Sequence, residues 1–71
     1  MNNYIFYDLE GGRLATITGE SLEIYGGDLQ EFFQVVETKV DKTGGTLSRI
    51  KGMVNSSIVG YVEVVEIKEA K

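Results

Sequence analysis

The 71-residue chain contains no cysteine, no histidine, no proline and no tryptophan. The absence of cysteine excludes disulfides, thiolate nucleophiles and cysteine-based zinc or iron–sulfur sites. The absence of histidine removes the commonest general base near neutral pH and the commonest ligand of transition metals. Carboxylates remain, but the sequence around them supplies no apolar pocket of the kind that a catalytic carboxylate requires. We therefore expect that the protein is not an enzyme and holds no metal or cofactor.

Long hydrophobic runs are absent as well. The longest strictly apolar stretches, such as Val35-Val36 and Val64-Val65, are two residues long and fall far below the length that spans a membrane. The first residues, Met1-Asn2-Asn3-Tyr4, lack the basic segment and apolar run of a secretory signal. These features predict a cytoplasmic protein without membrane contact, and we expect a prokaryotic or phage source for so small a protein.

Basic residues are few, and most of them lie in one segment. The formal net charge is −4, with −6 over residues 1–38 and +3 over residues 39–51. An acidic chain is repelled by the phosphates of nucleic acid, so nucleic acid is not the expected partner. Two alternatives stay open: the basic segment contacts nucleic acid, or the acidic surface imitates nucleic acid and blocks a basic partner. The basic patch consists of Lys39, Lys42, Arg49 and Lys51.

The size of the chain predicts a single domain over residues 1–71 with a small core. Area scaling gives about 4,400 Å² of accessible surface when folded, so that roughly 62% of the unfolded surface is buried. Such a core supplies a free energy of unfolding on the order of a few kcal/mol, to which self-association would add.

Three diglycine pairs divide the chain into segments of secondary-structure length. Paired glycines are typical of tight turns and helix ends because glycine tolerates positive φ. Before and between the first two pairs, Tyr4–Leu9, Arg13–Thr18 and Leu22–Tyr25 predict three strands of an antiparallel meander. The pairs are Gly11-Gly12, Gly26-Gly27 and Gly44-Gly45.

Residues 28–42 predict an α-helix. Asp28 is placed to cap the helix, Gly44-Gly45 is placed to end it, and we expect Phe32 and Phe33 to dock it on the sheet. The alternative is a strand–turn–strand, because β-branched residues prefer strands and residues 41–44 are typical of a hairpin turn. The apolar stripe at helical spacing consists of Leu29, Phe32, Phe33, Val36 and Val40. The residues that favour a strand are Val35, Val36, Thr38 and Val40.

Thr46–Val54 and Ile58–Lys68 predict two further strands, joined by the turn formers Asn55-Ser56-Ser57. The last strand is apolar on both sides, which is typical of a strand covered on both faces. The predicted fold is therefore α+β, in the order β-β-β-α-β-β, with one helix packed across an antiparallel sheet. This order resembles the β-grasp architecture, and the resemblance in order and length carries no function with it. The alternative is a small all-β barrel in which residues 35–54 form a hairpin.

Aromatic and aliphatic residues on the predicted strands form the candidate binding surface. Tyrosine combines a large contact area with a polar tip and is enriched at interface hot spots. We therefore expect a small non-catalytic interaction or regulatory protein that forms homo-oligomers and also binds a larger protein. The candidate interface residues are Tyr4, Tyr7, Tyr25, Val59, Tyr61, Val65 and Ile67.

Overall fold

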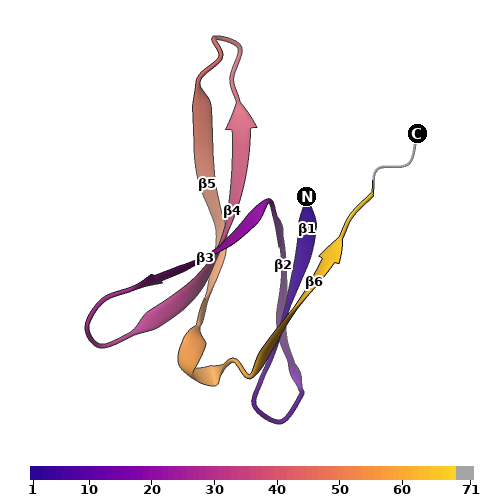
Figure 1. Ribbon diagram of the computed structural model, residues 1–71, viewed down its shortest axis with the longest axis vertical. Helices are drawn as coiled ribbons and strands as arrows, with labels where there is room; N and C mark the ends of the chain where they lie inside the picture. The colour runs from indigo at the N-terminus through magenta and orange to yellow at the C-terminus, as the bar shows by residue number, and fades with distance from the viewer. Residues whose placement is uncertain (69–71) are drawn as a thin grey trace.

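The computed structural model describes residues 1–68, and this part of the chain forms six β-strands in two antiparallel sheets. Sheet A has the strand order β2-β1-β6 and sheet B has the order β3-β4-β5. Sheet A lies on the right in Figure 1, where the β3–β4 and β4–β5 hairpins of sheet B diverge as two arms, toward the lower left and the top. The elements are β1 (Asn2–Tyr7), β2 (Arg13–Gly19), β3 (Ser21–Gly26), β4 (Glu31–Val40), β5 (Thr46–Asn55), the 3-10 turn η1 (Ser56–Ile58) and β6 (Tyr61–Glu66).

The predicted helix over residues 28–42 is wrong, and so are the α+β fold and the β-grasp order. Residues 31–40 form β4, the central strand of sheet B, and η1 is the one helical segment in residues 1–68. The helical stripe also fails as a buried set: Leu29 is 96% exposed, whereas Val35, outside the stripe, is fully buried. The all-β alternative fits, since residues 35–54 lie in the β4–β5 hairpin, although the strands form two sheets. Strand preference of the β-branched residues outweighs the helical spacing here.

Each sheet turns one face, its inner face, toward the other sheet. Residues paired across neighbouring strands share a face, so the register assigns every strand side chain to the inner or the outer face of its sheet. At the centre, Phe6 and Val35 are fully buried, and the rings of Phe6 and Phe33 lie 6.0 Å apart between centroids. The inner-face residues that form or border this core are Tyr4, Phe6, Ala15, Ile17 and Val62 from sheet A, and Leu22, Phe33, Val35 and Val54 from sheet B.

Two glycines allow the sheets to approach closely at this centre. A Cβ atom on Gly52 would lie 2.7 Å from Cδ1 of Ile17, and one on Gly19 would overlap the side chain of Val35. Gly19 ends β2, and the next residue, Glu20, donates its backbone N–H to the carbonyl of Val36. The chain therefore passes from sheet A into sheet B at the tightest contact between them.

The β1–β2 and β4–β5 hairpins share one turn design. In both, an aspartate precedes a diglycine, and its Oδ1 accepts backbone N–H groups from the residues two and four positions on: Asp8 in the first turn, Asp41 in the second. Gly11 and Gly44 have φ of 91° and 86°, which favours glycine. The hydroxyl of Thr43 and the N–H groups of Gly45 and Thr43 lower the pKa of Asp41 below its usual range. Two of the three predicted diglycine turns are thus built alike.

The strand β6 corrects a further expectation. Its residues are apolar on both sides, but β6 is an edge strand of sheet A, paired with β1 alone. Val64 is 56% exposed and Val65 is 41% exposed, so this strand is not covered on both faces. The predicted turn at residues 55–57 is confirmed, because Asn55 caps η1 by accepting the backbone N–H of Ser57.

The chain leaves much of its apolar surface exposed. In residues 1–68, four apolar residues are buried, whereas fifteen large hydrophobic residues are exposed. The accessible surface is 5367 Å², whereas area scaling predicts about 4,400 Å² for a monomer of this mass. The excess of roughly 1,000 Å² is comparable to the ~800 Å² that one partner buries in a standard interface. Helices that are long and apolar enough to cross a membrane are absent from the described residues.

Candidate protein-binding face

The outer face of sheet B, which points away from sheet A, carries almost no charge. Its central residues are apolar or uncharged, and Glu23 is the one ionisable group that the register places on it apart from Tyr25. Interfaces are likewise depleted of charge at their cores and enriched in aromatic residues and methionine. The members of this face are Ser21, Glu23, Tyr25, Phe32, Gln34, Val36, Thr38, Val40, Thr46, Ser48, Ile50, Met53 and Asn55.

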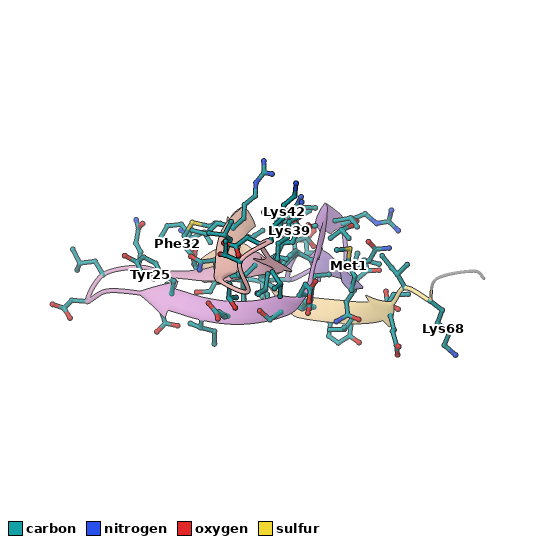
Figure 2. The ribbon with its side chains drawn as sticks, turned by 90° about the horizontal axis from the view of Figure 1, so that it is seen from above. Met1, Tyr25, Phe32, Lys39, Lys42 and Lys68 are labelled. Carbon is teal, nitrogen blue, oxygen red and sulfur yellow. The ribbon has the colours of Figure 1, made fainter. Side chains whose placement is uncertain are left out.

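Apolar side chains run the length of this face. Tyr25 pairs with Phe32 at the β3–β4 end, and the labels of Figure 2 place the two side by side on that arm. Val36 pairs with Ile50 at the middle, and Val40 lies at the far end. Tyr25 is 63% exposed and Val40 is 74% exposed, so each end of the face is open to solvent. A hollow of about 550 Å³ at the β3–β4 end is lined by Tyr25, Phe32 and residues 26–30.

The two ends of this face differ in charge. The acidic end, formed by the β3–β4 hairpin, carries Glu23, Asp28 and Glu31, and residues 21–31 contain no basic residue. The basic end, formed by the β4–β5 hairpin, carries Lys39, Lys42 and Arg49 around Asp41. The outer face of sheet B, which carries Glu23 alone as a charge, is therefore a strip that runs between two hairpins of opposite net charge, and the register places Glu31, Lys39 and Arg49 on the inner side of these hairpins.

The outer face of sheet A carries charges of both signs, Arg13 and Glu63, and several of its polar groups form hydrogen bonds with one another. The Tyr7 hydroxyl donates a hydrogen bond to Oε1 of Glu63 at 2.8 Å, which raises the pKa of Tyr7 above 10.0. The Thr18 hydroxyl donates to Oδ1 of Asn3. Tyr7 also lies against Tyr61, with 5.9 Å between ring centroids. Several side chains of this face therefore already have partners within the chain.

The structure separates the seven predicted interface residues. Tyr4 is 4% exposed and belongs to the core, and Val59 packs against that core. Ile67 follows β6 and donates its backbone N–H to the carbonyl of Met1. One of the seven, Tyr25, lies on the outer face of sheet B. The three that share the outer face of sheet A are Tyr7, Tyr61 and Val65.

The structure does bring the basic patch together on the β4–β5 hairpin. Figure 2 shows Lys39 and Lys42 close together on this arm. Glu37, which is 9% exposed, lies within it: the Nζ atoms of Lys51 and Lys39 are 3.4 and 4.0 Å from its carboxylate oxygens. The carboxylate therefore offsets part of the positive charge of the patch. Clusters of three or more metal-ligating side chains are absent from the described residues.

The sequence prediction missed five members of the outer face of sheet B. In a helix Phe32 and Phe33 share a buried stripe, but in a strand neighbours alternate, so Phe33 points to the core and Phe32 points outward. One signal was available: residues 41–45 repeat the Asp-x-x-Gly-Gly pattern of residues 8–12, which was already assigned to a hairpin turn. The missed residues are Phe32, Val36, Val40, Ile50 and Met53.

Comparison of the chain with protein-family models, with curated proteins and with solved structures finds no match.

Proposed function

We propose that this chain is a non-catalytic protein-interaction or regulatory protein that binds a protein partner through the outer face of sheet B. The observation that carries this proposal is the outer face of sheet B from Tyr25 to Val40, where Glu23 is the one charged residue and the large apolar residues Tyr25, Val40, Ile50 and Met53 are exposed. Contiguous apolar patches on small proteins are typical of protein-binding sites. The cytoplasm is the proposed location, since a chain without cysteine needs no oxidising compartment to fold.

The nucleic-acid alternative has less support from the structure. Glu37 lies within 4.0 Å of two of the four residues of the basic patch, Lys39 and Lys51. The exposed tyrosine of sheet B, Tyr25, lies at the acidic end, where stacking on a base would bring phosphates toward carboxylates. Apolar contact with a protein suits the strip better than contact with a polyanion.

Position-specific photo-crosslinking tests the proposed function. A benzophenone-bearing amino acid replaces Met53 on the outer face of sheet B or, as the control, Val65 on the outer face of sheet A. The two positions are matched in exposure, at 43% and 41%. In an extract of the cells that make the protein, we expect a discrete protein adduct from position 53 and none from position 65. Adducts from position 65 alone would assign binding to sheet A, and adducts from neither would remove the proposal.

A further inference from the structure

We propose that the partner on the outer face of sheet B is a second copy of the chain, laid on it with β4 running in the opposite direction. This inference rests on the proposed function, because it identifies the protein that covers the strip. It is carried by the charges at the two ends of the strip and by the amount of surface that remains uncovered.

The charges at the two ends are complementary. Residues 21–31 carry a net charge of −3 and residues 38–49 carry +2. Asp28 and Lys42 lie in the turns at these ends, and both are exposed. Each end also presents large apolar side chains, among them Leu29, 96% exposed, and Val40, 74% exposed. Each end therefore carries a net charge opposite to that of the other end, together with exposed apolar side chains that could pack against it.

One molecule cannot join its own two ends. β4 has ten residues, and at a rise of ~3.3 Å per residue it separates the two turns by about 30 Å along the strand. Charges interact over about 10 Å at 0.1 M salt, so the ends of one chain do not neutralise each other. Figure 1 shows the two arms diverging, with their turns at opposite ends of β4.

A second copy laid in the reverse direction places an opposite charge against each end at once. Its basic end faces the acidic end of the first copy, and its acidic end faces the basic end, so the same contact is made twice. This arrangement is a closed two-fold dimer, the commonest symmetry of soluble oligomers. A copy laid in the same direction would place Asp28 against Asp28 and Lys42 against Lys42, where like charges repel.

The excess accessible surface of the whole chain is comparable to the area that each partner buries in a stable dimer. The chain exposes 5367 Å², roughly 1,000 Å² more than a compact monomer of its mass, and a standard interface takes ~800 Å² from each partner. At the centre of the strip Ile50 and Met53 are exposed and can pack face to face with the same residues of a second copy, whereas Val36 is already 7% exposed within the chain. The dimer interface would then combine an apolar centre with a charged rim.

Sedimentation equilibrium of the purified chain at low salt tests this arrangement. We expect a dimer of about 16 kDa, twice the 7.9 kDa of the chain. In the reversed dimer position 28 faces position 42 of the other copy, so Asp28→Lys places two positive charges in each of these contacts and Lys42→Glu places two negative charges there; each variant alone should dimerise about tenfold more weakly. An equimolar mixture of the two variants should recover the wild-type affinity, because position 28 of each copy then faces an opposite charge at position 42 of the other.

Matched controls separate this effect from a change in net charge. Glu66→Lys and Lys68→Glu make the same charge changes at exposed positions on or beyond β6, in sheet A, and should leave dimerisation unchanged. Circular dichroism of all four variants checks that each one folds. The proposal is overturned by a monomer at high micromolar concentration, by species that grow beyond the dimer, or by a mixture that fails to recover. If the purified chain is monomeric while position 53 still crosslinks another protein, the binding face stands and the second copy is wrong.

Discussion

The outer faces of the two sheets differ in how far their side chains form contacts within the chain. On sheet A, Tyr7 bonds to Glu63 and Thr18 bonds to Asn3, so polar side chains pair across strands. On sheet B, the outer face presents aromatic and aliphatic side chains from Tyr25 to Val40 with one carboxylate among them. A sheet that is apolar on both faces needs cover on both. Sheet A covers the centre of the inner face, whereas Ile24 and Leu47 toward its ends stay 67% and 61% exposed. This difference is the basis on which we propose that sheet B contacts the partner.

The largest expected effect is on the free energy of unfolding. It comes from the same substitution at two adjacent residues that lie on opposite faces of β4. Phe33→Ala removes a ring that packs against Phe6 and should lower the free energy of unfolding by about 3 kcal/mol. Phe32→Ala acts on the outer face and should cost the dilute monomer about 1 kcal/mol. Urea unfolding at low protein concentration measures both. A larger loss from Phe32→Ala would reverse the assignment of the two faces.

The close contact of the inner faces predicts the next largest effect. Gly52→Ala places a Cβ atom 2.7 Å from Cδ1 of Ile17, and the shift that this forces should cost about 1–3 kcal/mol. Gly27→Ala is the matched control, because its Cβ would meet no atom within 4 Å. Thermal unfolding of the two variants compares them. Equal stability would show that the sheets are not in contact at Gly52.

The pairing on the outer face of sheet A predicts the smallest effect, a shift in one pKa. The hydrogen bond to Glu63 raises the pKa of Tyr7 above 10.0. The resulting stabilisation is complete below pH 10 and is lost as the pH rises through the raised pKa. Glu63→Gln should therefore bring the pKa of Tyr7 back toward 10.0, as followed by NMR of its ring. Glu66→Gln, on the inner side of the same strand, should leave this pKa unchanged; an unchanged value in Glu63→Gln would contradict the pairing.

Local signals in the sequence predicted the elements of sheet A well. The segments predicted at residues 4–9 and 13–18 overlap β1 (Asn2–Tyr7) and β2 (Arg13–Gly19), and the diglycine between them lies in the turn, because strand preference and turn chemistry act over a few neighbours. Sheet B was missed at its central strand. Apolar residues on both faces of β4 imitate a helical stripe: Phe33 and Val35 pack in the core from the inner face, and on the outer face Val36 is buried whereas Val40 is exposed. The sequence also does not show which strands pair in the same sheet. The structure places Tyr7 and Tyr61 in sheet A and Tyr25 in sheet B, so the predicted interface residues do not share one surface.

The most direct test of the central claim is a dilution series of amide NMR spectra of the unmodified chain. As the concentration rises from low to high micromolar, signals from the outer face of sheet B, such as those of Tyr25, Ile50 and Met53, should shift together. Signals of Ile5 and Val65, on the outer face of sheet A, should stay in place. Concentration-dependent shifts confined to β1 and β6 would contradict the account, as would a spectrum that does not change at all.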